Sequence, residues 1–196
     1  MIVHNINFPK FLGVRCLMMP YIQGDSSSVP DEYASYNEII DSIFIKNGDI
    51  GYLTIDESFT SKGKPHRGAR ARTNRALHTE AGLRPGKIYA WGGLSDMVTV
   101  DGNVEVLLAN SIDDSCALWD AHHENTSIDG DIGHVSAQYP YKDAIMMKAG
   151  EVHKIGIFTP HESLPAKQDA KRQFLRILSA GVHGREPYFT INSKML

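Results

Sequence analysis

The sequence has few cysteines and no long apolar run, and both absences narrow its class. Cys16 and Cys116 are its only cysteines in 196 residues and form no C-x-x-C pair, which excludes a disulfide framework and favours a reducing compartment. No run of about 18 apolar residues occurs. Residues 1–11 contain His4 and Lys10 where an export signal needs an unbroken apolar segment. We therefore expect a cytoplasmic protein without a membrane span.

Several mechanistic motifs are missing as well. The sequence contains no G-x-G-x-x-G, G-x-x-x-x-G-K-[ST], G-x-S-x-G or H-E-x-x-H motif, which argues against nucleotide cofactors and serine hydrolysis. Both cysteines lie beside apolar residues, a setting that favours inert buried thiols over activated nucleophiles. With 20 Lys+Arg against 23 Asp+Glu the net charge is −3, which argues against a dedicated nucleic-acid binder.

What is present indicates one mainly β domain. A chain of 196 residues fits the roughly 100–200 residues of a single domain. Apolar residues recur at helical spacing before Gly48 and predict a helix near 29–47. After Gly48, short apolar or alternating runs bounded by Gly, Pro, Asn and Asp predict strands at 50–55, 87–91, 97–100, 104–109, 117–119, 144–147, 152–158 and 174–178.

No long helical pattern alternates with these strands, which favours an antiparallel sandwich or barrel over a βαβ sheet. The number of strands suits a double-stranded β-helix (a cupin-like jelly roll) with an N-terminal helix. We predict that it spans residues 1–196, with a β core over about 49–190. Jelly rolls often pair through strand edges, so a homodimer is a further hypothesis, although no particular edge is indicated.

The histidines offer one candidate metal centre. In a strand, residues two apart face the same way, so His78 and Glu80 would present an imidazole and a carboxylate to one ion. A 2-His-1-carboxylate site, which lets non-haem Fe(II) bind a keto acid and oxygen, needs a second histidine. His161, 83 residues later, follows a predicted strand and supplies it, with His153 as a rival.

Two arginines are candidates to bind the keto acid. Arg172 lies eleven residues after His161, on the next predicted strand, where its guanidinium would pair bidentately with the distal carboxylate of a keto acid on the metal. Arg176 shares the same strand face and is the alternative anchor.

The segment 149–178, with TPHESLP (159–165) and RQFLRI (172–177), resembles the C-terminal core of a largely uncharacterised microbial family. LTIDE (53–57), LHTE (77–80), CALWD (116–120) and DGD (129–131) are similar to its other landmarks, over roughly 51–187. The same pattern more distantly resembles the Fe(II)/2-oxoglutarate dioxygenase superfamily. That resemblance implies that His78, Glu80 and His161 bind the metal and that Arg172 anchors the keto acid. The sequence departs from the superfamily in having Glu80 where Asp is usual and Pro160 beside His161.

Other polar segments have competing interpretations. Residues 120–134 are rich in Asp and His, as a second metal site would be, but Asp and His beside Gly are more typical of turns; Asp120 and His122 stay candidate substrate contacts. Residues 62–75 hold six basic and no acidic residues, which fits a solvated loop or a lid over an anionic substrate, with Arg75 as a candidate contact. No aromatic residue interleaves with these charges to stack on nucleic-acid bases.

These observations lead to three hypotheses. The first is an Fe(II)- and 2-oxoglutarate-dependent dioxygenase that hydroxylates a small molecule or a side chain of unknown identity. The second is a cupin-like barrel that binds a metal or small ligand without oxygenase chemistry, because a fold does not determine a function. The third is a structural or interaction jelly roll without a metal.

Overall fold

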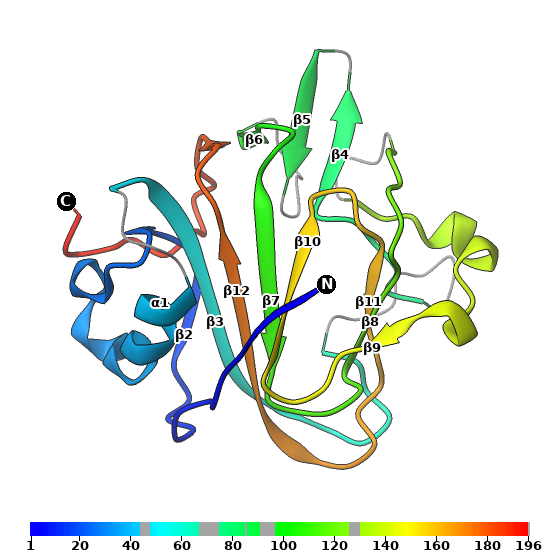
Figure 1. The fold of residues 1–196 in the computed structure, drawn as a ribbon, viewed down its shortest axis with the longest axis horizontal. Coiled ribbons are helices and arrows are strands. Elements are labelled where there is room, and N and C mark those ends of the chain that lie inside the picture. The colour runs from blue at the N-terminus through cyan, green and yellow to red at the C-terminus, as the bar shows by residue number, and fades with distance from the viewer. Residues whose placement is uncertain (44–47, 67–74, 85, 91–96, 126–129, 196) are drawn as a thin grey trace.

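The chain folds into three antiparallel sheets and a small helical region (Figure 1). The computed structural model describes residues 1–43, 48–66, 75–84, 86–90, 97–125 and 130–195. The helical segments are the 3-10 helices η1 (Ser26–Ser28), η2 (Asp31–Tyr36), η3 (Gly133–Gln138) and η4 (Tyr141–Asp143) and the α-helix α1 (Asn37–Ile43). The prediction of a mainly β fold is confirmed.

The largest sheet has six strands in the order β1-β10-β7-β12-β3-β2, a second has β11-β8-β9, and a third has β13-β6-β5-β4. Their bounds are β1 (Ile2–Asn5), β2 (Arg15–Ile22), β3 (Ile50–Thr60), β4 (Ala81–Arg84), β5 (Lys87–Ala90), β6 (Thr99–Val100), β7 (Glu105–Asn110), β8 (Cys116–Leu118), β9 (Ile145–Met146), β10 (Glu151–Gly156), β11 (His161–Ser163), β12 (Ala170–Leu178) and β13 (Val182–His183).

Strand β12 lies inside the six-stranded sheet and pairs along its whole length with β3. Because side chains alternate between the two faces of a strand, Arg172, Phe174 and Arg176 share one face of β12. Leu175 and Ile177 lie on the other face, in the apolar cluster that includes Tyr36 of η2. Towards its C-terminal end the strand therefore has one apolar face, and on its other face two arginines alternate with apolar side chains.

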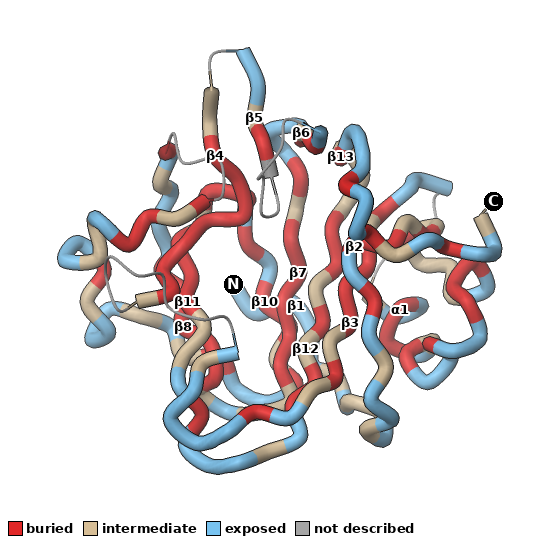
Figure 2. The backbone as a smooth tube through the Cα atoms, turned by 180° about the vertical axis from the view of Figure 1, so that it is seen from behind, coloured by how far each residue is buried: buried red, intermediate tan, exposed pale blue. Residues whose placement is uncertain are grey.

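Both faces of this sheet are covered. One apolar cluster joins the six-stranded sheet to the two smaller sheets and includes Leu108, Cys116 and Ile155. The other lies between the sheet and the helical region and includes Ile40 and Leu53. Figure 2 shows the resulting run of buried residues along β7, β12 and β3. Any cavity next to the arginines of β12 therefore lies between sheets, in the interior of the protein.

The helix predicted near 29–47 is present as two shorter consecutive helices. The described part of this segment is a 3-10 helix, η2, followed by the seven-residue α1, and residues 44–47 lie outside the described residues. Tyr33, Tyr36 and Ile39 are buried and lie three residues apart. That spacing matches the three residues per turn of a 3-10 helix, so a period of 3 was read from the sequence as a period of 3.6.

The predicted strands agree with the structure apart from their ends, except that Trp91 lies outside the described residues. Strands β1, β2, β4, β11 and β13 were not predicted. In β2 the register with β3 shifts between Cys16 and Met19, so its apolar residues do not alternate regularly. Pro20 also lies within this strand, and proline is unfavourable for a strand prediction. The jelly-roll topology stays a prediction.

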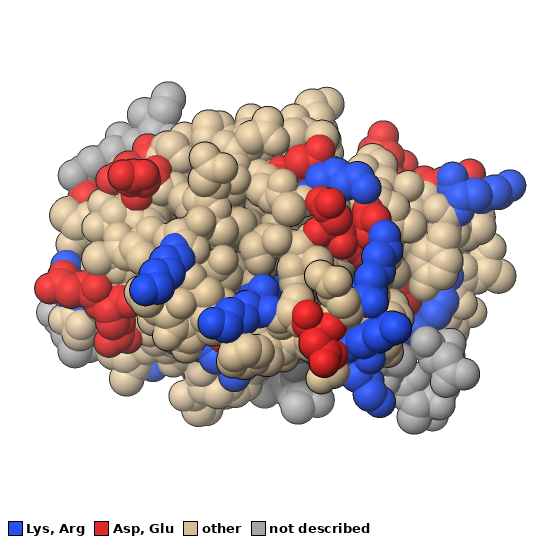
Figure 3. All heavy atoms as spheres, turned by 90° about the horizontal axis from the view of Figure 1, so that it is seen from below, with Lys and Arg blue, Asp and Glu red and all other residues tan. Residues whose placement is uncertain are grey.

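The lower face of the molecule carries mixed charges. Figure 3 shows basic and acidic side chains interspersed on it, without a large patch of one sign. Asp114, for example, pairs with both Lys148 and Lys167, at 2.6 Å each. Arg67, Arg70 and Arg72 of the predicted basic loop lie outside the described residues. The hypothesis that this segment forms a lid concerns those residues and stays a prediction. No helix in the described ranges is long and apolar enough to cross a membrane.

A buried carboxylate ties the N-terminal segment to the six-stranded sheet. Glu57 Oε2 accepts the backbone N–H groups of Leu12, Gly13 and Val14 at 2.5–3.2 Å. Its Oε1 accepts the Tyr36 hydroxyl and the Gln173 amide, each at 2.8 Å. Five donors thus converge on one buried acceptor.

We predict that Glu57→Gln lowers the free energy of unfolding by about 2–4 kcal/mol, because an amide NH2 group would face buried N–H donors. Urea denaturation measures this change. The exposed Glu38→Gln is the matched control and should change stability by less than about 0.5 kcal/mol. Equal effects of the two substitutions would contradict the role given to Glu57.

Candidate functional site

His78 and His161 lie side by side despite their distance in the sequence. The backbone N–H of each donates to the carbonyl of the other, at 2.9 Å in both directions. Their imidazole centroids are 4.0 Å apart. His161 begins β11, which pairs with β8. The antiparallel bridge between the two residues therefore brings both imidazoles to one place, as the spacing argument required.

Both histidines are held in the same tautomer. Nδ1 of His78 lies 2.6 Å from the carbonyl oxygen of Ala76, and Nδ1 of His161 lies 2.9 Å from that of Thr159. Because a carbonyl oxygen can only accept, each Nδ1 carries the proton. In the neutral ring Nε2 is then the nitrogen without a proton, and such a hydrogen bond from Nδ1 is the usual way in which a metal-binding histidine is oriented.

Glu80 completes the predicted triad at the same position. It is buried, and its Oε1 lies 3.3 Å from His161 Nε2. Two ligands at about 2.1 Å from one ion and about 90° apart lie about 3 Å from each other, so this separation suits neighbouring ligands. Burial would raise the pKa of Glu80, but the charge of Arg176 holds it well below its ordinary value.

The three side chains do not form a complete metal site as they are placed. Within the described ranges, no group of three or more His, Cys, Asp or Glu side chains is arranged so that it could hold a metal ion. What fits a divalent metal is the donor set: two oriented Nε2 atoms and a buried carboxylate, with acceptor atoms of His161 and Glu80 facing each other. Either a proton or a cation between those two acceptors removes their repulsion.

Arg172 is a buried cation with unused donors. Its Nη2 donates to Asn110 Oδ1, and its guanidinium carbon lies 5.1 Å from the centroid of the Phe174 ring. Its Nε and Nη1 have no hydrogen-bond partner among the described residues. Burial lowers its pKa to about 10, so it stays charged at neutral pH. An anion in the adjoining cavity would satisfy these donors.

Arg176 is already committed to Glu80. Its Nη1 lies 2.9 Å from Glu80 Oε2, and its Nη2 lies 3.5 Å from Thr54 Oγ1. The two arginines on one face of β12 are therefore in different states, because only Arg172 lacks an acidic partner among the ion pairs of the described residues.

These groups surround one cavity of about 130 Å³. Its polar wall is made by the triad, the two arginines, His66 and Ser163, and its apolar wall by Leu108, Cys116 and Phe174. Burial raises the pKa of the Cys116 thiol to about 12, which agrees with its interpretation as inert. A larger groove of about 340 Å³ lies elsewhere and is lined by none of the triad residues. The smaller cavity is the candidate site because the convergent polar groups are there.

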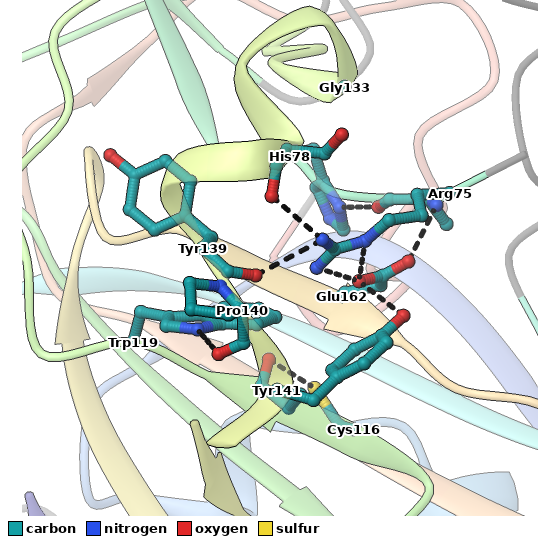
Figure 4. Close-up of polar contacts among 12 residues, drawn as sticks. Arg75, His78, Cys116, Trp119, Gly133, Tyr139, Pro140, Tyr141 and Glu162 are labelled. Atoms are coloured by element: carbon teal, nitrogen blue, oxygen red, sulfur yellow. Dashed lines mark hydrogen bonds and ion pairs between the residues drawn. The ribbon is translucent and has the colours of Figure 1, made fainter. Parts of the chain in front are cut away.

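Arg75 belongs to a buried clamp beside His78 (Figure 4). Its guanidinium binds Glu162 Oε2 at 2.7 and 2.9 Å and donates to the carbonyls of Ser136 and Tyr139. The ring of Tyr141 lies 4.5 Å from its guanidinium carbon. These contacts give Arg75 a structural role, and the predicted substrate contact stays a prediction.

The clamp reaches the candidate site through two further hydrogen bonds. Glu162 Oε1 accepts the backbone N–H of Ala76 at 3.1 Å, and the carbonyl of Ala76 is the acceptor that orients His78. Glu162 itself follows His161 directly in β11. The ion pair therefore fixes the backbone on both sides of the histidine pair.

Asp120, His122 and His153 lie outside the wall of the candidate cavity. Asp120 is exposed and lines the larger groove. The exposed His122 ring contacts Phe158, and its Nε2 lies 3.4 Å from Glu124. His153 is fully buried on β10, and its Nε2 lies 3.0 Å from Glu151 Oε2. It therefore does not compete with His161 for the site.

The turn interpretation of residues 120–134 agrees with the contacts of Asp131. Its Oδ1 accepts the backbone N–H of Gly133 at 2.9 Å, which is a local side-chain-to-backbone turn bond. Asp129 lies outside the described residues.

His66 and Asp56 are site residues that sequence reasoning missed. His66 lines the cavity, its Nε2 lies 3.0 Å from Asp56 Oδ2, and its backbone N–H donates to Ser163 Oγ. It therefore bridges β3 and β11 across the cavity wall. The only signal in the sequence was Asp56 within a strand with polar residues at alternate positions, and nothing paired it with His66.

No protein-family model, curated protein or solved structure matches this chain.

We predict that Arg75→Met lowers the free energy of unfolding by about 3 kcal/mol, because it leaves the buried Glu162 carboxylate without its cation. Thermal or urea unfolding measures the loss. Lys154→Met is the control, since the Lys154–Glu105 pair is about half exposed and such pairs contribute about 0–1 kcal/mol. A loss no larger than that of the control would contradict the clamp.

Asp56 predicts a pH dependence of stability. Burial raises its pKa, but the hydrogen bond and charge of His66 and the charge of Arg15 outweigh this and lower it to about 2. A carboxylate whose pKa is lowered in the folded state stabilises the fold at pH values above its unfolded pKa of about 4. This contribution is lost as the pH falls towards the folded pKa. The stability difference between wild type and Asp56→Asn, measured by urea unfolding, should therefore shrink from about pH 5 to about pH 2.5. A constant difference for Asp56→Asn over this pH range would refute the assignment.

Proposed function

We propose that this protein is a non-haem Fe(II)- and 2-oxoglutarate-dependent oxygenase on a cupin-like jelly roll. His78, Glu80 and His161 would hold the metal, and Arg172 would bind the keto acid. The observation that carries the proposal is the convergence of two Nδ1-protonated histidines, a buried carboxylate and a buried arginine with unused donors on one cavity.

The charge of the cavity supports an anionic ligand. With neutral histidines its lining holds two arginines and one glutamate, a net charge of 2 − 1 = +1, and a divalent metal would add two more. An uncompensated charge of this sign in the interior is costly, and an anion offsets it. Among the described residues of the lining, Arg172 has two unpartnered donors, Nε and Nη1, and Arg176 has one, Nε; Arg172 therefore offers a carboxylate a pair of donors.

The size of the cavity supports a small acid. A volume of about 130 Å³ is close to that of cavities that bind a benzene-sized ligand, about 150 Å³. It has room for one compact keto acid, and the molecule to be oxidised would approach from outside this space.

In this function the metal would supply the redox chemistry with oxygen and the keto acid. The residues of the chain would do the rest. His78 and His161, whose Nδ1 atoms are held by the carbonyls of Ala76 and Thr159, would bind the metal through Nε2. Arg172 binds and orients the carboxylate, and the apolar wall limits the access of water.

The first test is an anaerobic titration of the metal-free protein with Fe(II) and 2-oxoglutarate, followed by visible absorption and calorimetry. We expect binding of both, loss of metal binding in His161→Ala, and 2-oxoglutarate binding about tenfold or more weaker in Arg172→Met. Metal binding without an effect of Arg172→Met would favour the cupin-like binder without oxygenase chemistry. Absence of metal binding in the wild type would refute the metal site and favour the structural jelly roll.

A further inference from the structure

We propose that Arg176 is a positioning residue for the metal ligand Glu80: it holds one carboxylate oxygen so that the other faces the metal. The inference rests on the metal site proposed above. It adds a role for a residue that the sequence offered only as an alternative keto-acid anchor.

The two oxygens of Glu80 have different partners. Oε2 accepts Arg176 Nη1 at 2.9 Å, whereas Oε1 lies 3.3 Å from His161 Nε2. Arg176 thus makes its close contact, through Nη1, with one oxygen of Glu80. The other oxygen lies next to the two imidazoles, and the geometry favours a carboxylate that would bind through Oε1 alone.

Arg176 is itself fixed at the other end. It is opposite Thr54 of β3 and Leu108 of β7 in the register of the sheet, and its Nη2 lies 3.5 Å from Thr54 Oγ1. Its side chain is 12% exposed. A guanidinium held inside a sheet can restrict its partner, whereas a mobile surface arginine cannot.

Glutamate has a particular need for such a partner. It has one more methylene group than aspartate, and therefore one more rotatable bond between the strand and the carboxylate. Freezing that bond has an entropy cost that would otherwise be met on metal binding. Arg176 fixes the carboxylate beforehand, so the metal meets an oriented ligand.

Positioning and simple charge repulsion predict opposite effects. A cation beside a metal site repels the metal, so removing Arg176 would strengthen metal binding if charge alone mattered. If Arg176 orients Glu80, removing it weakens binding, and loss of such an outer partner typically costs 10–100-fold in metal affinity. The sign of the change therefore decides between the two.

The experiment is a calorimetric titration with Co(II), which binds such donors more tightly than Fe(II). We expect Arg176→Met to weaken binding about 10–100-fold. Lys171→Met, an exposed cation on the same strand, is the matched control and should leave the affinity unchanged. If circular dichroism shows that Arg176→Met does not fold, Arg176→Lys decides; a point charge without the planar guanidinium should weaken binding about threefold or more.

A double-mutant cycle separates positioning from a general structural effect. In the Glu80→Gln background, Arg176→Met should change Co(II) affinity little, because its partner is already altered. Unchanged or tighter binding in Arg176→Met, or an equal loss in both backgrounds, would overturn the inference while leaving the metal site intact. Absence of Co(II) binding in the wild type would instead overturn the proposed metal site, and this inference with it.

Discussion

The candidate site depends on the pair of backbone hydrogen bonds that join His78 to His161. This pair places two imidazoles from opposite halves of the chain beside each other. Each ring donates its Nδ1 proton to the carbonyl two residues before it, Ala76 or Thr159, so both rings are oriented by their own backbone. Because the backbone sets both position and tautomer, the site needs only a buried carboxylate and a cation from other strands to become chemically competent.

Charged side chains lie on both sides of that bridge, and the two sides differ in how their charge is balanced. Behind the histidines, the Arg75–Glu162 pair fixes the backbone by neutralising itself and binding Ala76. In front of them, the arginines of β12 leave the cavity wall positive. The charge on the rear side is balanced within the protein, and that of the cavity is balanced only if a ligand enters. This difference separates the part that supports the site from the part that would use a ligand.

Sequence reasoning predicted what depends on local periodicity. The structure brings His78, Glu80, His161 and Arg172 to one cavity, but not as the strand argument expected: His78 makes only isolated bridges and Glu80 lies in a bend just before β4. The different roles of Arg172 and Arg176 could not be predicted, because both lie on one face and only the opposing strands give Arg176 its partner. Sequence reasoning assigned Arg75 to a basic loop, because its partner Glu162 is distant in the sequence. The interrupted alternation of β2 likewise hid a real strand.

A comparison of two buried glutamates shows why Glu80 carries the functional interpretation. Glu57 accepts five hydrogen bonds, three of them from consecutive backbone amides, so its charge is fully used to fix the fold. Glu80 is also buried, but the side chains that its carboxylate contacts among the described residues are one arginine and one histidine. A carboxylate that costs so much to bury and is bound so incompletely would gain further stabilisation from a second cation beside Arg176. That cation would lie beside the imidazoles of His78 and His161.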